Sequence, residues 1–327
     1  MSTSTDDLAA STAETYRAFA GQAHGRSPRY EELTLAVAED PVVLRFLGTL
    51  PVAKRQPNLL FAAARYLLDE PASSATLRAL VTDRSAELTE TVLTRRTQTN
   101  EPARCATLLP ALAQLPQPLA LLEVGASAGL GLLVDRYSYD YDGHLVTGTD
   151  PRAPVLRCQP RGPVPLPTRV PDVAWRAGLD LNPLDVTDDD DVRWLECLLW
   201  PGEADREARL AGAVAAARRQ PPTVHRGDLL TDLPALISEA PRDATLVVFH
   251  SAVLAYVSRP QRAAFARTVG GLGAIWLSNE APGVIPGIAA PGSVGQTFLL
   301  IRDGAEVVAR TDSHGSWLDW ETTALAT

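Results

Sequence analysis

The stretch Leu121 to Tyr137, LLEVGASAGLGLLVDRY, constrains the fold of this chain more than any other. It joins an apolar run, Leu119 to Val124, to a glycine-rich turn and then to apolar residues at helical spacing. The run is too short for a helix and is bounded by Pro118 and Gly125, so it predicts a buried parallel strand. Glycine at 125 and 129 lets the backbone turn sharply close to a ligand, beside the unpaired N–H groups of the following helix. A nucleotide-like ligand fits such a turn.

The turn supports three interpretations. Read as Glu123-x-Gly125-x-x-x-Gly129, it is similar to the first motif of Rossmann-like methyltransferases, in which the turn accommodates the methionine part of S-adenosylmethionine. Read as Gly125-x-Ser127-x-Gly129, it matches the nucleophile elbow of α/β-hydrolases, with Ser127 exposed between strand and helix. The third interpretation is a glycine turn that only closes a βα unit.

Composition favours a small-molecule partner. The chain has 327 residues, 46% hydrophobic and 21% charged, as in ordinary globular proteins. Its net charge of −9 argues against nucleic acid, because such binding depends on Lys and Arg neutralising phosphates. Cys105, Cys158 and Cys197 are too widely spaced to indicate a zinc site or a disulfide framework. We expect no membrane span and no signal peptide, and therefore a cytoplasmic location.

Residues 1–115 are predicted to form a helical region. Alanine- and leucine-rich segments with helical periodicity are interrupted by prolines, and β-branched runs are absent. Polar clusters stand at the ends of these segments, around Ser27 and at Asn100, Glu101 and Arg104. Helix capping is the simpler interpretation of both clusters. The alternative is that the second cluster binds substrate, with Arg104 holding a carboxylate in a two-pronged contact.

After the turn, His144 to Thr149 predicts the second strand of the sheet, with Asp150 at its end. A carboxylate about 20 residues beyond the glycine turn can accept hydrogen bonds from ribose hydroxyls, although a simple turn aspartate fits as well. Residues 151–187 are rich in proline and predict an irregular insertion. Within it, Arg176 and Asp180 are candidate substrate-binding residues.

The C-terminal third returns to alternating strands and helices, which predicts a parallel sheet. Expected strands end at Gly227-Asp228, at His250-Ser251 and at Ser278-Asn279-Glu280. Residues 296–302 and 306–311 then flank Asp303-Gly304, a strong hairpin signal. We therefore expect an α/β, Rossmann-like, mostly parallel sheet with an antiparallel C-terminal hairpin over residues 116–327.

Several motifs together resemble a known family. SPRY, QTNE-x-x-R, LLEVGASAGL, DRYSYDY, GLDLNPLDV, WPGEADREARL, VVFHSAVLAYV and WLSNE are similar to domain-of-unknown-function family 2332, an uncharacterised bacterial family. The resemblance covers nearly the whole chain and implies a fold like that of class I S-adenosylmethionine-dependent methyltransferases. Gly131 departs from the asparagine expected after AGL.

The favoured function is methyl transfer from S-adenosylmethionine to a small molecule, in a pocket covered by the helical region. His250 is the expected general base, because its ordinary pKa lies near neutrality, and the alternative is a buried imidazole bonded to a backbone carbonyl. The candidate catalytic set is His250, Glu280 and Tyr256. The cofactor set is Glu123, Gly125, Ser127, Gly129, Asp150 and Asp228, and the substrate set is Asn100, Glu101, Arg104, Arg176 and Asp180.

Two other functions remain open. A serine hydrolase would use Ser127 as nucleophile, Asp228 as acid, and His250 or His314 as base, which is the chain order of α/β-hydrolases. In α/β-hydrolases, however, the nucleophile elbow lies deep within a sheet whose earlier strands precede it, whereas Ser127 follows the first strand expected in this chain. A non-catalytic cofactor-binding protein is the second alternative. No metal site is expected, and the oligomeric state is left open.

Overall fold

The structure, a computed structural model, describes residues 5–288 and 297–321, and the chain forms two compact units. The first unit comprises Met1–Thr99 and Asp188–Ala208. The second comprises Asn100–Thr187 and Arg209–Thr327. All candidate site residues named from the sequence fall in the second unit. Helix α9 (Ala204–Arg219) has residues in both.

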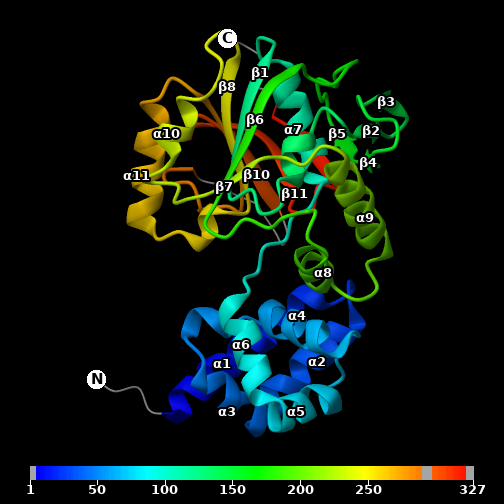
Figure 1. Cartoon of the computed structure of the whole chain (residues 1–327), viewed down its shortest axis with the longest axis vertical. Helices are drawn as coiled ribbons and strands as arrows, with labels where there is room; N and C mark the ends of the chain where they lie inside the picture. Colours follow the sequence, from blue (N-terminus) through cyan, green and yellow to red (C-terminus); the bar gives the residue numbers. More distant parts are fainter. Residues whose placement is uncertain (1–4, 289–296, 322–327) are drawn as a thin grey trace. The chain divides into compact units, whose positions relative to one another are not determined.

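The first unit is helical, as the sequence predicts (Figure 1). Its elements are α1 (Thr5–Ala23), α2 (Pro28–Glu39), α3 (Pro41–Thr49), η1 (Val52–Lys54), α4 (Pro57–Leu68), α5 (Ser74–Asp83), α6 (Ser85–Thr94) and α8 (Asp189–Cys197). Proline begins α2, α3 and α4, where its missing N–H removes no helical hydrogen bond. Asp40 caps α3 by accepting hydrogen bonds from the backbone N–H groups of Val42 and Val43.

Aromatic side chains bind residues 188–208 into this unit. The Trp200 ring packs against Phe19 and Tyr30, with centroids 5.2 and 6.1 Å apart. Ser27, the predicted cap of α2, instead donates its hydroxyl to the carbonyl of Pro201 at 2.8 Å. A segment beyond the predicted boundary at residue 115 therefore packs with the N-terminal helices.

The second unit is built on a nine-stranded sheet with the order β5-β12-β11-β10-β9-β8-β1-β6-β7. Its strands are β1 (Leu119–Val124), β5 (Gln159–Arg161), β6 (Val173–Asp180), β7 (Val224–Arg226), β8 (Thr245–Ser251), β9 (Ile275–Glu280), β10 (Thr297–Arg302), β11 (Glu306–Asp312) and β12 (Trp317–Trp320). Strands from β7 to β9 pair in parallel, and those from β9 to β12 pair antiparallel. The predicted mostly parallel sheet with antiparallel C-terminal strands is confirmed.

The parallel strands follow the doubly wound order. Numbered along the chain as β1, β6, β7, β8 and β9, they lie in the spatial order 3-2-1-4-5. The winding direction therefore reverses between β1 and β8. In open α/β sheets, ligands bind beyond the carboxyl ends of the strands at such a switch point. This places the glycine turn after β1 at the expected ligand position.

The second strand of the main sheet is not the one that the sequence predicted. Residues 144–146 do form a strand, β3, but it belongs to a separate sheet with the order β3-β2-β4, in which β2 is Ser138–Tyr141 and β4 is Val155–Arg157. The strand beside β1 is β6, within the insertion predicted to be irregular. Proline content misled the prediction, because no proline stands between Pro171 and Pro183 and the strand Val173–Asp180 is free to pair.

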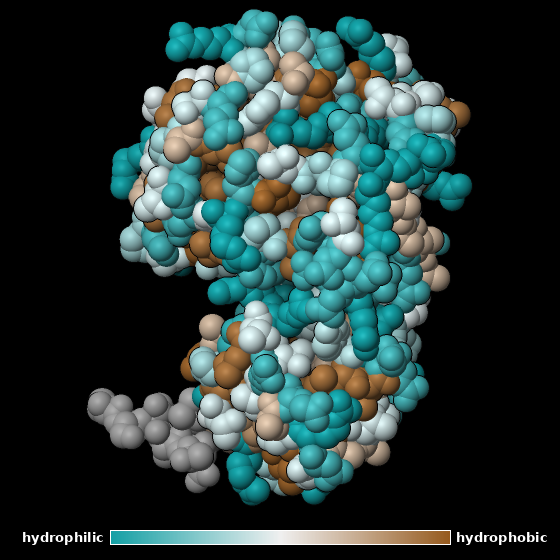
Figure 2. Space-filling view, in the orientation of Figure 1, coloured by the Kyte–Doolittle hydropathy of each residue, from teal (hydrophilic) through white to brown (hydrophobic). Residues whose placement is uncertain are grey.

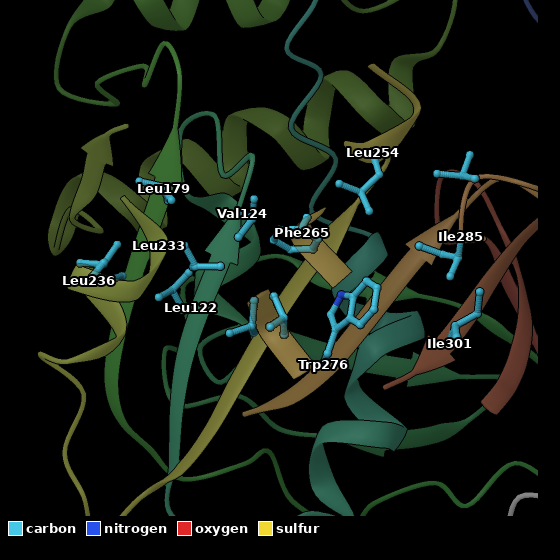
Figure 3. Close-up of a cluster of buried hydrophobic side chains, with 14 of the residues drawn as sticks. Leu122, Val124, Leu179, Leu233, Leu236, Leu254, Phe265, Trp276, Ile285 and Ile301 are labelled. Carbon is cyan, nitrogen blue, oxygen red and sulfur yellow. The ribbon is translucent and has the colours of Figure 1, made fainter. Parts of the chain in front are cut away.

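One face of the sheet packs on α10 (Leu233–Ile237) and α11 (Arg259–Gly270), and α7 (Arg104–Ala113) lies on the opposite side (Figure 1). Figure 3 shows the α11 side, where Leu122, Val124 and Trp276 pack with Phe265. Neighbouring residues along a strand face opposite sides of a sheet. Glu123, between Leu122 and Val124, therefore faces the α7 side.

The predicted C-terminal hairpin is confirmed as β10 and β11, although Gln296 lies outside the described residues. Asp303 and Gly304 have φ of +52° and +67°, which suits the tight turn that their sequence predicts. Strand β12, which the sequence analysis did not predict, pairs with β11 and then in parallel with β5.

On the face drawn in Figure 2, hydrophilic residues alternate with smaller apolar areas. Large exposed apolar side chains such as Leu145, Leu181 and Tyr256 are scattered over different elements. Among residues 5–288 and 297–321, no helix is both long and apolar enough to cross a bilayer.

Candidate functional site

The loops that follow the parallel strands meet at one edge of the sheet. We call this region the carboxyl edge and define it as residues 123–129, 180–182, 227–228, 251–256 and 278–280. Glu123 in β1 lies opposite Gly178 of β6 on one side and Phe249 of β8 on the other. The carboxyl edge therefore contains the switch point and most of the predicted site residues.

The glycine turn is bonded to β6 and to itself. The backbone N–H groups of Gly125 and Ala126 point to the carbonyl of Leu179, at 2.7 and 3.4 Å, and Gly129 donates to Ala126 at 2.7 Å. Ser127 has a left-handed φ of +53°, as do the two flanking glycines at +68° and +72°. Left-handed backbone at a residue other than glycine is strained and is concentrated at functional sites.

The helix predicted after the turn is replaced by a single short 3₁₀ helix, η2 (Leu130–Leu133). The N–H of Leu130, its first residue, donates to the side-chain oxygen of Asn100 at 2.9 Å. The backbone donors of Gly125, Ala126, Gly129 and Leu130 are thus engaged within the protein. The anion-binding helix terminus that we expected from the sequence does not form here, because such a site needs N–H groups directed at the ligand.

Asp180 ends β6 and organises the turn from the neighbouring strand. One carboxylate oxygen accepts the N–H of Ser127 at 2.8 Å, and the other accepts the N–H of Asn182 at 2.8 Å. In the doubly wound fold, the acid that binds ribose stands at the end of the strand beside β1. Asp180, which the sequence analysis placed in the substrate set, occupies that position.

Asp150, the predicted ribose ligand, lies elsewhere. It lies in the connection between β3 and β4 of the small sheet, and its carboxylate pairs with Arg219 of α9. The hydrogen bond from Arg219 and a second from the backbone of Arg152 lower the pKa of Asp150. Asp228 does follow a strand of the main sheet, β7, and accepts the N–H of Leu230 at 2.7 Å. The acids at the ends of β6 and β7 are therefore Asp180 and Asp228.

Glu123 is a buried carboxylic acid with an unsatisfied oxygen. Its side chain lies close to Gly131, where an added Cβ would be 2.4 Å from Oε1. Oε2 is buried and has no hydrogen-bond partner within the described part of the chain. Burial, together with the charge of Asp180, raises the pKa of Glu123 to about 8, against the lowering effect of Arg104. Such an acid can donate or accept a hydrogen bond near neutral pH.

Glu280, on the other face of the sheet, accepts its hydrogen bonds through one oxygen, whereas Oε2 is buried and has no hydrogen-bond partner within the described part of the chain. Oε1 accepts hydrogen bonds from His250 Nδ1 at 2.8 Å and from the backbone N–H groups of Val253 and Leu254 at 2.8 and 2.9 Å. Burial alone would raise the pKa of Glu280, but these hydrogen bonds hold it below its ordinary value. Glu280 thus fixes the start of the loop after β8.

His250 is buried, with both ring nitrogens engaged. Trp276 Nε1 donates to His250 Nε2 at 3.0 Å, and the indole nitrogen can only donate. The imidazole is therefore neutral, with its proton on Nδ1 directed at Glu280. This arrangement agrees with the alternative stated from the sequence, a satisfied buried imidazole, except that its partners are a carboxylate and an indole. It leaves neither nitrogen available to act as the predicted general base.

The loop after β8 reaches over the glycine turn. Ala252 has a left-handed φ of +59°, and its N–H donates to the carbonyl of Asn279 at 3.1 Å. A Cβ on Gly125 would lie 2.5 Å from the side chain of Val253, so Gly125 is in tight contact with this loop. At the end of η3 (Leu254–Tyr256), Tyr256 is 69% exposed.

Arg104 and Asn100 bind backbone groups instead of forming one face of a helix, since α7 begins at Arg104. The Arg104 guanidinium donates to the carbonyls of Ser313 and Ser251 at 2.8 and 3.2 Å. It therefore connects the end of β8 with the turn after β11. This bracing contact was one of the roles that the sequence left open for Arg104.

Arg176 and Glu101 form ion pairs inside the second unit. Arg176 holds Asp135 through two hydrogen bonds of 2.8 and 2.9 Å, which fix the segment after η2 against β6. Glu101 accepts the N–H of Ala103 at 3.2 Å and pairs with Arg209 at 3.1 Å. The capping interpretation is not confirmed, because the N-cap of α7 is Ala103 and no side chain among the described residues caps this helix. The substrate roles of both residues stay predictions.

The sequence analysis missed Val253 and Trp276. Val253 is an ordinary apolar residue whose contact with Gly125 depends on two loops meeting, so no local pattern marks it. Trp276 lies in the WLSNE motif, but a tryptophan in a predicted strand usually indicates only that the position is buried. The position of Asp180 had a usable signal, because VAWRAGLD ends in an acid immediately before Leu181 and Asn182.

The sheet order and the glycine turn at the switch point define a doubly wound, Rossmann-like α/β protein. A bacterial family described as "Uncharacterized protein conserved in bacteria (DUF2332)" matches residues 13–320, so the chain belongs to this family and the predicted resemblance is confirmed. No curated protein matches the sequence.

Proposed function

We propose that the second unit binds S-adenosylmethionine at the carboxyl edge and transfers its methyl group to a small molecule. One observation carries the proposal. Carboxyl groups stand at the ends of three adjacent strands, Glu123 on β1, Asp180 on β6 and Asp228 after β7, around a glycine turn at the switch point. In doubly wound folds this arrangement accompanies a ligand that contains a nucleoside.

The chemistry of the site favours a nucleoside ligand without phosphate. Several backbone donors of the turn are already used within the protein, and the carboxylates of Asp180 and Asp228 would repel a phosphate. Ribose hydroxyls, an adenine amino group and a positively charged amino acid end all suit carboxylate acceptors. S-adenosylmethionine has these groups, whereas NAD and NADP carry phosphates.

The residues present fit this cofactor. Asp180, held in place by backbone N–H groups, would bind the ribose, and Asp228 would bind the adenine amino group. The buried, unpartnered Oε2 of Glu123 would receive the ammonium group of the amino acid end. Asp150, which is paired with Arg219 away from these strand ends, has no part in this arrangement.

When bound, the cofactor supplies a methyl group already activated by the sulfonium charge. The protein then mainly has to align the acceptor atom with the methyl carbon and the sulfur. Because His250 is engaged at both nitrogens, we assign it a structural role and no proton transfer. Tyr256, exposed at the tip of the loop after β8, is the candidate for contact with the acceptor.

A serine hydrolase is the second candidate, favoured by the strained backbone of Ser127. Ser127 is only 4% exposed, however, whereas a nucleophile elbow presents its hydroxyl to substrate. The proposed bases also bind elsewhere: His250 contacts Glu280 and Trp276, and His314 Nδ1 contacts Ser313. These contacts make the hydrolase the weaker proposal, and a protein that binds cofactor without turnover is the third.

A thermal-shift series on the full chain tests the choice of ligand. S-adenosylmethionine and its demethylated product should raise the melting temperature, because a ligand that binds only the native state stabilises it by mass action. NAD and NADP at equal concentration should have no effect. Stabilisation by the dinucleotides alone would refute the proposal, and covalent labelling of Ser127 by a fluorophosphonate probe would favour the hydrolase.

A further inference from the structure

The side chain of Val253 occupies the space directly above the glycine turn. A Cβ built on Gly125 would lie 2.5 and 2.7 Å from the two terminal carbons of Val253. Carbon atoms in optimal contact are about 3.5 to 4.0 Å apart, so the isopropyl group fills the volume that the glycine leaves. In the proposed function the amino acid end of the cofactor needs this same volume. Val253 and the ligand therefore compete for one place.

The backbone that carries Val253 is strained and is bound to β9. Ala252, the preceding residue, has a φ of +59°, a conformation that residues with a Cβ rarely adopt. The segment keeps this shape because β9 binds it: Glu280 Oε1 accepts the N–H groups of Val253 and Leu254, and the carbonyl of Asn279 accepts that of Ala252. A small number of hydrogen bonds thus positions the valine over the turn.

The position of Glu280 makes it the central anchor of this segment. Its side chain is fully buried and is itself fixed by His250, which is fixed in turn by Trp276. The outer end of the loop, by contrast, carries the exposed Tyr256. Beyond Val253 the loop is attached again, because Leu254 is fully buried in the core cluster and Arg262 of α11 donates to the carbonyls of Ala255 and Val257. Ala252 and Val253 are therefore the part of the loop that can move off the turn while the core stays in place.

From this geometry we infer that Val253 gates the glycine turn and that Glu280 is its positioning residue. Ligand enters when Ala252 and Val253 shift so that the valine side chain leaves Gly125, and the size of the side chain at 253 determines how readily this happens. The inference rests on the proposed function only for the identity of the ligand. The movement itself can be measured without any ligand.

Thiol accessibility in a Ser127→Cys variant measures the movement. Ser127 is 4% exposed, and the native Cys105, Cys158 and Cys197 are buried, so a small methanethiosulfonate reagent should label Cys at 127 only when the turn is uncovered. Adding Val253→Ala removes two partly buried methyl groups and should speed labelling about tenfold. Val253→Ile should slow it. Labelling rates that do not respond to either change would overturn the inference.

Val257→Ala is the matched control. It removes the same two methyl groups from the same segment, but Val257 packs on the core cluster beside α11 instead of on the turn. Its labelling rate should stay within about twofold of the Ser127→Cys parent. An equal acceleration in both variants would mean that the segment loosens generally, and would refute a specific gate at Val253.

The role of Glu280 is tested by removal and rescue in the same background. Glu280→Ala should speed labelling, and Glu280→Gln should restore the slow rate, because its amide oxygen still accepts hydrogen bonds from the loop. Labelling of Cys105, measured by mass spectrometry in the same sample, reports global unfolding. If Glu280→Ala accelerates both cysteines equally, Glu280 only stabilises the fold and the positioning role fails.

The two proposals have separate outcomes. If labelling responds to Val253 but S-adenosylmethionine does not bind, the gate stands and the proposed function fails. If S-adenosylmethionine binds, but Val253→Ala changes neither its association rate nor the labelling rate, the proposed function stands and the gate is refuted.

Discussion

Glu123 and Glu280 are both buried carboxyl groups near the ends of parallel strands, yet their surroundings differ completely. Glu280 accepts three hydrogen bonds through one oxygen, and its pKa is lowered despite burial. Glu123 lies on the opposite face of the sheet, and its pKa is raised to about 8 by burial and by the charge of Asp180. Burial is common to both acids, and so is an Oε2 without a partner among the described residues, so the hydrogen bonds to Oε1 of Glu280 and the charge of Asp180 near Glu123 produce the difference in pKa.

The comparison separates a group that supports the site from one that is available to a ligand. A buried carboxylate that already accepts several hydrogen bonds stabilises the fold and fixes its neighbours. A buried acid whose pKa is raised is not compensated in this way, and strongly perturbed pKa values are concentrated at functional sites. We therefore assign Glu280 to the support of the loop after β8, and Glu123 to the binding of ligand.

The largest expected effect is that of Glu280→Ala on stability. The change leaves three donors, those of His250, Val253 and Leu254, without their acceptor in a buried place. The free energy of unfolding should fall by about 3 to 5 kcal/mol, as when one partner of a buried polar pair is removed. Urea denaturation at neutral pH measures this. If the unfolding free energy falls only as little as it does when an exposed residue is substituted, the contrast between Glu280 and Glu123 is wrong.

Glu123→Gln should change the pH dependence of stability. Between its ordinary pKa of 4.5 and the folded value of about 8, folded Glu123 keeps a proton that the unfolded chain has lost. Its stabilising contribution is therefore full below pH 4.5 and disappears as pH rises through 8, a loss on the order of 5 kcal/mol. Measured at pH 5, 7 and 9, the unfolding free energy of Glu123→Gln relative to that of wild type should rise with pH. Parallel curves would contradict the raised pKa.

The smallest expected effect is that of Arg104→Lys. Arg104 donates to the carbonyls of Ser251 and Ser313 from two different nitrogens, and a lysine ammonium on a flexible stem cannot reproduce that geometry. Stability should fall by about 1 kcal/mol, while the affinity for cofactor should be unchanged. Calorimetric unfolding and a binding titration on the same variant separate the two. A selective loss of affinity would return Arg104 to the ligand-binding set.

The sequence predicted the central framework because its signals are local. An apolar run between Pro118 and a glycine turn marked β1, and Asp303-Gly304 marked the C-terminal hairpin. It did not predict the partner of β1, because a short strand such as His144–Val146 carries no information about which sheet it joins. Asp150 was therefore chosen as the ribose ligand, whereas Asp180 occupies that place.

The site was predictable in outline and not in its contacts. The glycine turn and the strand-end acids Glu123, Asp228 and Glu280 were all named from sequence and all lie at the carboxyl edge. His250 looked like a free base because its partners, Glu280 and Trp276, are 30 and 26 residues away along the chain. The contact of Val253 with Gly125 likewise arises only when β1 and β8 pair.

Isothermal titration of S-adenosylhomocysteine, the demethylated product, into wild type, Asp180→Asn and Asp150→Asn tests the central claim most directly. The two variants make the same chemical change, one at the end of β6 and one at the surface pair with Arg219. We expect wild type and Asp150→Asn to bind alike, and Asp180→Asn to lose about tenfold or more in affinity, as expected for a hydrogen bond to a charged group. An unliganded melting temperature for each variant separates this loss from a change in stability. Normal binding by Asp180→Asn, or loss only in Asp150→Asn, would contradict the assignment of the carboxyl edge as the cofactor site.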